Sequence, residues 1–214
     1  MTTALLQTTY FGPIQWYQKL NRYDLCMIEQ YDSFQKQTYR NRCVIATANG
    51  VQALTVPVEH SPLTSHHSPL VKDLRISDHN QWRRVHWNAL QSAYSESPFF
   101  EYYADDLHPF FEQKYEFLID FNETIRQKIC ELIDIRPKVE YTSSYIPSPP
   151  PFVRVGVGSL IDFRDVINAK HPQPDAEFAA KHYWQVFQHK HGFLPNLSIL
   201  DLLFNMGPES IFYL

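Results

Sequence analysis

The stretch ALLQTTYFGPIQWYQKLNRYDLCMIE, residues 4–29, decides the fold class of this chain. Residues 4–10 are mostly apolar and predict a buried strand. Pro13 then stands where a helix begins, and the apolar residues that follow it fall on one helical face. Residues 24–29 predict a second short strand. Strand, helix and strand joined by short connections predict an α/β protein with a mainly parallel, Rossmann-like sheet flanked by helices.

A β-hairpin is predicted immediately downstream. Residues 43–46 and 54–58 are rich in residues that favour strands, and Asn49-Gly50 between them supplies the positive φ angles that a tight turn needs. A further strand is expected over residues 71–76.

Four helices are predicted in the rest of the chain. Apolar residues spaced three and four apart predict helices over about 82–94, 98–107 and 115–133. Asn196 is expected to cap a final helix, which Gly207 ends.

Prolines interrupt the chain between these helices. The segment 141–174 carries a run of prolines at 149–151 and is expected to be an irregular, proline-rich excursion. Apolar character returns after it, so we expect one domain over residues 1–214 rather than two joined by a linker.

Composition bounds the function class. The chain has 214 residues with 44% hydrophobic residues, enough for a sizeable core, and a net charge of −4, which argues against a nucleic-acid binder. No apolar run approaches the length of a membrane span, and the N-terminus lacks the pattern of a signal peptide. Three cysteines without a CxxC pair fit reduced thiols. We therefore expect a cytoplasmic protein without an integral membrane segment; a homodimer is left open, and no motif names a cofactor.

Six segments spread over the chain carry a resemblance to a known family: FGPIQWY (11–17), FQKQTYRNR (34–42), LTVPV (54–58), Trp82 with His86 and Tyr94, SPFF (97–100) and LPNLSILDLLFNMGPE (194–209). Together they resemble the WbqC-like protein family and follow one another in the family's order. The resemblance implies an association with bacterial genes for O-antigen and other surface polysaccharides. Many relatives carry a regular strand–helix–strand stretch before the C-terminal block, whereas residues 141–151 are short and proline-rich here.

One of these segments is a local positive island. Acidic residues are absent from 33–58, whereas Lys36, Arg40 and Arg42 stand close together. If the chain is extended there, Arg40 and Arg42 point to one face and Asn41 points to the other. Two guanidinium forks match a pair of phosphates or a carboxylate-bearing sugar, so these four residues are predicted to bind an anionic small molecule.

A second role remains open for the arginines. They could belong to a solvated strand start and pair with Asp32 or Glu29. If the island does bind a ligand, Lys36, Arg40 and Arg42 are expected to clamp its phosphates. Asn41, Tyr17 and Trp82 are expected to line the sugar site, and Tyr94 is a further expected ligand-binding residue.

His86 is the candidate catalytic base. It lies one helical turn after Trp82 on an apolar stripe, and burial would keep its imidazole neutral and able to accept a proton. The alternative is a hydrogen-bonded core histidine. Glu101 could orient His86 or bind a sugar hydroxyl, or it could simply be the exposed acid of a helix start.

No metal site is predicted. His66 and His67 are expected in a loop, and His182, His189 and His191 cluster near the end of the chain. No acidic or cysteine partner stands at a recognisable offset from any of them.

These observations lead to two functional hypotheses. The first is an enzyme of surface-glycan assembly, a transferase that acts on a nucleotide-linked or phosphorylated sugar by group transfer such as N-acylation. The second is a non-catalytic protein that binds a glycan precursor or acts as a scaffold for another glycan enzyme. A His86 that is hydrogen-bonded to the backbone and sealed from any cavity would deprive the enzyme hypothesis of its proton carrier.

Overall fold

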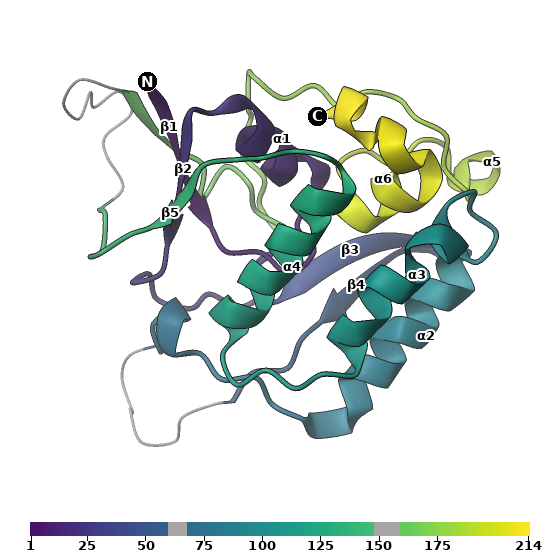
Figure 1. Cartoon of the computed structure of the whole chain (residues 1–214), viewed down its shortest axis with the longest axis horizontal. Coiled ribbons are helices and arrows are strands. Elements are labelled where there is room, and N and C mark those ends of the chain that lie inside the picture. Colours follow the sequence, from purple (N-terminus) through teal and green to yellow (C-terminus); the bar gives the residue numbers. More distant parts are fainter. Residues whose placement is uncertain (60–67, 148–158) are drawn as a thin grey trace.

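A parallel sheet forms the left-hand part of the molecule in Figure 1. The computed structural model describes residues 1–59, 68–147 and 159–214. Within them the strands run in the order β5-β2-β1-β6, and all neighbouring pairs are parallel, which confirms the predicted α/β class. The strands are β1 (Thr2–Gln7), β2 (Leu25–Glu29), β5 (Val139–Tyr141) and β6 (Ser159–Asp162).

Helix α1 (Ile14–Arg22) connects β1 to β2, as the sequence predicts. Its backbone starts at Pro13 in an extended conformation, and its last turn carries basic residues that suit the helix dipole. The turn before it is tight: a Cβ on Gly12 would lie 2.5 Å from the side-chain oxygen of Thr9. Only glycine fits there without a shift of its neighbours.

A separate two-stranded antiparallel sheet confirms the predicted hairpin, but its second strand covers Gly50–Thr55 and not residues 54–58. It consists of β3 (Arg42–Thr47) and β4 (Gly50–Thr55), and Gly50 has a φ of 105°. The turn therefore needs glycine at this position, as the Asn49-Gly50 pair indicates.

The longer helices lie around this hairpin and across the sheet. In Figure 1, α2, α3 and α6 gather on the right, beside β3 and β4, while α4 crosses the front of the view. Their inward faces form one aromatic core, in which the ring of Tyr10 stacks on Phe121 at 5.7 Å and meets Trp82 edge-on at 6.5 Å. The helices are α2 (Trp82–Tyr94), α3 (Phe100–Leu107), α4 (Leu118–Leu132), the short α5 (Gln188–His191) and α6 (Ile199–Met206).

The strand predicted over 71–76 is wrong. Val71–Asp73 forms a 3-10 turn, and the residues after it make only isolated bridges. Backbone bonds from this segment run to several different partners, including Val71 N–H to the carbonyl of Asp32 and Ile76 N–H to that of Glu116. A strand needs one continuous partner, and this segment has none among the described residues.

The cap predicted for the last helix is also wrong. Ser198 is the N-cap of α6, and its hydroxyl accepts from the backbone N–H of Leu200 at 3.3 Å. Asn196 serves a different helix: its Oδ1 accepts from the backbone N–H of Gln15 in the first turn of α1, at 2.9 Å. The predicted cap and the observed cap lie two residues apart, and tertiary contacts decide which helix each one serves.

The segment 141–174 is not irregular throughout, contrary to the prediction. Residues 159–162 form β6, which pairs with residues 2–5 of β1. Two apolar residues between Ser159 and Asp162 are too few to give a strand signal, and their partner lies more than 150 positions earlier in the chain. The proline run at 149–151 lies outside the described residues.

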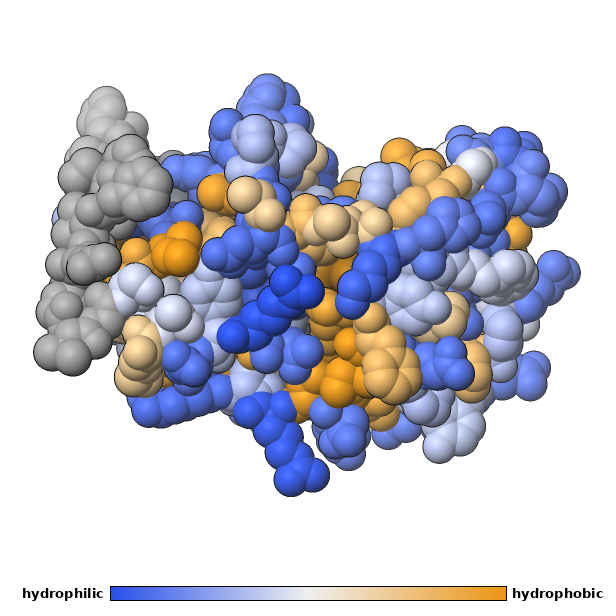
Figure 2. Space-filling view, turned by 90° about the horizontal axis from the view of Figure 1, so that it is seen from above, coloured by the Kyte–Doolittle hydropathy of each residue, from blue (hydrophilic) through white to orange (hydrophobic). Residues whose placement is uncertain are grey.

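The surface seen from above in Figure 2 is mixed. Apolar areas on this face are broken by polar and charged side chains. In the described part of the chain no helix has both the length and the apolar composition that a membrane span requires.

Candidate functional site

Charged side chains gather at the carboxyl ends of the parallel strands. Glu29 ends β2, Asp162 ends β6 and Arg164 follows it closely, while Asp32 and Arg40 lie in the connection from β2 to β3. We call these five residues the carboxyl-end cluster. From β1 the chain moves outward to β2 and β5 on one side and later to β6 on the other, so the cluster spans the point where the strand order reverses. Ligands of open α/β sheets bind at such points.

Glu29 is the buried residue at the centre of the cluster, and only 1% of its surface is exposed. One carboxylate oxygen accepts from the backbone N–H of Tyr31 at 2.8 Å and the hydroxyl of Thr142 at 2.9 Å. The other accepts from the backbone N–H of Ile146 at 2.8 Å and lies 3.4 Å from Nη1 of Arg164. The carboxylate is therefore fully bonded, as a buried charge requires.

Arg164 joins two acidic residues of the cluster. Its Nη2 and Nε donate to Asp162 at 2.6 Å and 3.0 Å, while Nη1 faces Glu29. Burial lowers the pKa of Arg164, but the hydrogen bonds to Asp162 and the two acidic charges outweigh burial and leave the pKa raised. The guanidinium is thus a fixed positive charge.

Arg40 lies deeper than the sequence suggests, with 3% exposure. Its Nη2 forms an ion pair with Asp32, whose side chain is 16% exposed. Burial lowers the pKa of Arg40; the charges of Asp32 and Asp165 oppose this shift, and that of Arg164 adds to it. Its Nε is buried and has no hydrogen-bond partner among the described residues.

The positive island is therefore not assembled as predicted. Residues 39–41 lie in a turn, and β3 begins only at Arg42, so the two arginines do not share one strand face. Arg42 donates through Nε to the hydroxyl of Thr55 across the hairpin at 3.1 Å. Asn41 donates to the backbone carbonyl of Val56 at 2.8 Å, and Lys36 is exposed. The fold brings acidic groups to Arg40, which matches the ion-pair alternative at this residue.

His86 has the contacts of a core residue. It is 4% exposed, its Nδ1 lies 2.9 Å from the hydroxyl of Tyr10, and its ring also interacts with the backbone of Thr55. Burial lowers the pKa of His86 to about 4, with the Thr55 backbone opposing the shift, so the ring is neutral at pH 7. Of the other predicted site residues, Trp82 packs beside it, with ring centroids 5.1 Å apart.

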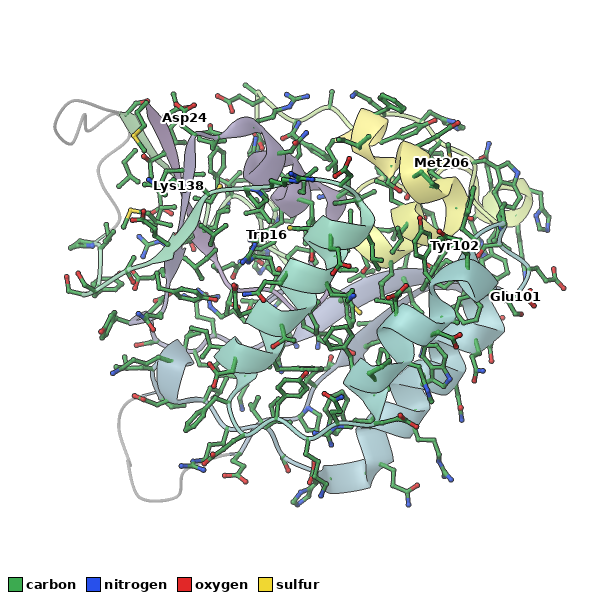
Figure 3. All side chains as sticks on the ribbon, viewed as in Figure 1. Trp16, Asp24, Glu101, Tyr102, Lys138 and Met206 are labelled. Atoms are coloured by element: carbon green, nitrogen blue, oxygen red, sulfur yellow. The ribbon has the colours of Figure 1, made fainter. Side chains whose placement is uncertain are left out.

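The remaining predicted residues lie apart from this pair. Tyr94 is buried and donates to Asp201 at 2.8 Å. Tyr17 is also buried, on α1, and no hydrogen-bond partner of its hydroxyl lies in the described ranges. Glu101 is exposed on α3, at the right-hand edge of Figure 3, whereas the ends of β1 and β2 lie in the left half of the view. The structure brings together His86 and Trp82, but not Tyr17, Tyr94 or Glu101.

The turn between β1 and α1 is covered by the C-terminal segment. The backbone N–H of Ile14 donates to the carbonyl of Leu197 at 3.0 Å, and the next N–H is capped by Asn196. The hydroxyl of Ser198 donates to the carbonyl of Phe11 at 2.7 Å. In a dinucleotide-binding domain the backbone N–H groups at the start of this helix hold the phosphates. Here the N–H groups of Ile14 and Gln15 are already bonded to the C-terminal segment, so an anion would have to bind away from the start of α1.

Four residues of the cluster were not among the predicted site residues: Glu29, Asp32, Asp162 and Arg164. Glu29 and Asp32 were named only as possible ion-pair partners of the arginines. For Glu29 a signal existed, because a charged residue directly after an apolar strand of a parallel sheet marks its carboxyl end. For Asp162 and Arg164 no such signal existed, since β6 itself was not predicted.

The described ranges contain no candidate metal site. No group of three or more histidine, cysteine, aspartate or glutamate residues there is placed to hold an ion. His182 packs on Phe193 at 4.5 Å, while His66 and His67 lie outside the described residues.

The fold and the cluster together define an α/β protein with a parallel sheet whose carboxyl edge carries buried ion pairs. A sequence model of the WbqC-like protein family matches residues 7–151, about two thirds of the chain, and the chain belongs to this family. It is also similar to Uncharacterized protein Rv1507c of Mycobacterium tuberculosis, with 26% identity over 99% of this chain and 96% of that protein. No solved structure matches it significantly.

Proposed function

We propose that the protein takes part in the assembly of bacterial surface glycans by binding a nucleotide-linked or phosphorylated sugar at the carboxyl-end cluster. Family membership supports the pathway, through the association that the family resemblance implies. The position of the cluster, where the strand order reverses, supports the location by analogy with other open α/β sheets.

Arg40 carries the proposal. A guanidinium has five N–H donors, and within the described residues the only side-chain hydrogen bond of Arg40 runs from Nη2 to Asp32. Its Nε is buried, and no described residue accepts a hydrogen bond from it. Buried donors that lack partners are costly, and a phosphate oxygen is the acceptor that a guanidinium binds best.

Two buried acceptors have no hydrogen-bond partner among the described residues. They are the hydroxyl oxygen of Thr9, in the loop after β1, and the amide oxygen of Asn122, on α4. Asn122 holds the two loops together, since its Nδ2 donates to the carbonyl of Arg40 at 2.8 Å and to the hydroxyl of Thr8 at 3.1 Å. A ligand that carries both phosphate oxygens and hydroxyl groups would match this mixture of free donors and acceptors.

One candidate is an enzyme that transfers a group to the bound sugar, with His86 as the base that the sequence predicts. The second candidate is a binding or scaffold protein of the same pathway, and the contacts of His86 favour it: the ring is buried and bonded to Tyr10. Turnover by wild-type protein and its loss in His86→Asn would support the enzyme; binding without turnover would support the second candidate.

The binding proposal is tested by thermal shift and calorimetry with UDP-, GDP- and dTDP-hexoses, acyl-CoA and free nucleotides. Arg40→Lys keeps the ion pair with Asp32 but removes the planar fork, so the affinity for a nucleotide-sugar should fall about ten- to a hundredfold. The matched control is Arg136→Lys, because the Arg136 side chain is 93% exposed. Equal affinities in both variants, or no binding to wild-type protein, would refute the proposal.

A further inference from the structure

The segment after β5 is tied across the end of β2. Thr142 donates its hydroxyl to Glu29 at 2.9 Å, and its carbonyl accepts from the side chain of Gln30 at 2.6 Å. Four residues on, the backbone N–H of Ile146 donates to the second oxygen of Glu29 at 2.8 Å. Both ends of the segment 142–146 are therefore held by the residue that anchors the carboxyl-end cluster.

Tyr145 lies within this tethered segment and is 50% exposed. The guanidinium carbon of Arg164 lies 5.6 Å from the centre of its ring, so the ring is adjacent to the cluster. The contrast with Tyr102 is clear: that ring is 73% exposed and packs on Tyr103, within α3 at the right-hand edge of Figure 3. Tyr145 is thus an exposed aromatic ring fixed at the edge of a polar site.

Two carboxylates of the cluster reach the surface, and one of them, Asp162, pairs with the arginine that lies against this ring. The side chains of Asp32 and Asp162 are 16% and 15% exposed, whereas the arginines with which they pair are almost completely buried. A group that approaches the cluster from solvent therefore meets acceptors for hydroxyl donors. A sugar ring offers such hydroxyls along its edge and an apolar C–H face above and below, and sites that bind such ligands combine a flat apolar wall with a few polar groups.

We propose that Tyr145 is the platform on which the sugar ring of the ligand stacks while Asp32 and Asp162 accept hydrogen bonds from its hydroxyls. This assignment rests on the proposed function and deepens it, because it places the sugar, rather than the nucleobase, against the tyrosine. Tyr145 is a specificity-determining residue in this account.

The test compares nucleotide-sugars with the matching nucleoside diphosphates, which lack the sugar, and with hexose 1-phosphates, which lack the base. Tyr145→Leu should weaken nucleotide-sugar binding about three- to tenfold and leave nucleoside diphosphate binding within about twofold. Tyr145→Phe keeps the ring and should bind like wild type. Tyr102→Leu is the matched control and should change nothing.

Three outcomes would overturn the assignment. An equal loss of nucleoside diphosphate and nucleotide-sugar binding in Tyr145→Leu would place the base on the ring. Wild-type affinity in Tyr145→Leu together with weakened binding in Arg40→Lys would refute the platform alone and leave the proposed function standing. If wild-type protein bound none of the probes, both proposals would fall together.

Discussion

Glu29 and Arg164 form a buried ion pair that crosses a strand. Glu29 ends β2 and Arg164 follows β6, and β1 lies between those strands, yet Nη1 of Arg164 lies 3.4 Å from Oε2 of Glu29. Their side chains are 0% and 4% exposed. Because the two strands do not touch, this pair is a direct link between the sheet's two sides at their carboxyl ends.

Removal of one partner should therefore destabilise the fold strongly. Arg164→Met would leave the charge of Glu29 buried and uncompensated, which costs about 3–5 kcal/mol. The double variant Glu29→Gln/Arg164→Met removes both charges and should recover part of this loss. Urea unfolding of the three proteins measures the effect, and equal stabilities of the single and double variants would contradict it.

A second buried carboxylate gives an independent prediction. Asp201 on α6 accepts from the hydroxyls of Tyr94 at 2.8 Å and Tyr183 at 2.7 Å. Burial raises the pKa of Asp201, and these hydrogen bonds oppose the shift. Tyr183→Phe should therefore destabilise the protein by about 1.5–3 kcal/mol, the contribution of a hydrogen bond to a charged group. Tyr102→Phe, on an exposed ring, should shift the unfolding midpoint little.

Local elements could be predicted from the sequence because each carries its own signal. The helix over 82–94 shows a helical period, and the hairpin shows Asn49-Gly50 between two strand-forming runs. The site could not be predicted in the same way. Arg40 lies in a stretch, residues 33–58, that contains no acidic residue. The fold nevertheless places Asp165 near it, from a segment more than 100 residues further along the chain.

Non-local pairing explains the other failures. Residues 159–162 become a strand only because β1 is their neighbour, and Asn196 caps α1 rather than α6 because the C-terminal segment folds back over the first turn. The burial of His86, by contrast, could be predicted from the sequence. Its position on an apolar stripe predicts burial, and burial is what the structure has.

Burial of His86 has a consequence for stability as pH changes. Its pKa of about 4 in the folded protein lies below the ordinary value of 6.5, so the unfolded chain takes up a proton first as pH falls. The free energy of unfolding therefore falls by roughly 3 kcal/mol as the pH drops from 6.5 to 4, and the fall is complete below pH 4. Above pH 6.5 the protonation of His86 leaves the free energy of unfolding unchanged.

The measurement is the free energy of unfolding across this range for wild type and His86→Gln. The variant has no titrating ring, so the difference between the two proteins should change with pH between 6.5 and 4. His171→Gln, at an exposed histidine, serves as the control. If the difference in unfolding free energy between wild type and His86→Gln stayed constant with pH, the pKa of His86 would be the same in the folded and unfolded protein. The ring would then be accessible to protons in the fold, which would support His86 as a catalytic base.

The two arginines of the basic segment should differ in their effect on ligand binding. Arg40 lies in the cluster, whereas Arg42 starts β3 and bonds to Thr55 across the hairpin. Arg42→Lys should therefore lower the affinity for a nucleotide-sugar by less than threefold, against ten- to a hundredfold for Arg40→Lys. Calorimetry with the tightest-binding probe decides this, and equal losses would restore the two-arginine clamp that the sequence predicts.

Hydrogen–deuterium exchange of the wild-type protein, with and without its tightest-binding nucleotide-sugar, tests the central claim most directly. A ligand at the carboxyl-end cluster should slow exchange in residues 30–42, 142–147 and 162–167, which surround Glu29 and Arg164. Exchange in the hairpin turn and in α3 should stay unchanged. Protection confined to the hairpin or to the C-terminal segment over α1 would contradict the account and place the ligand elsewhere on the molecule.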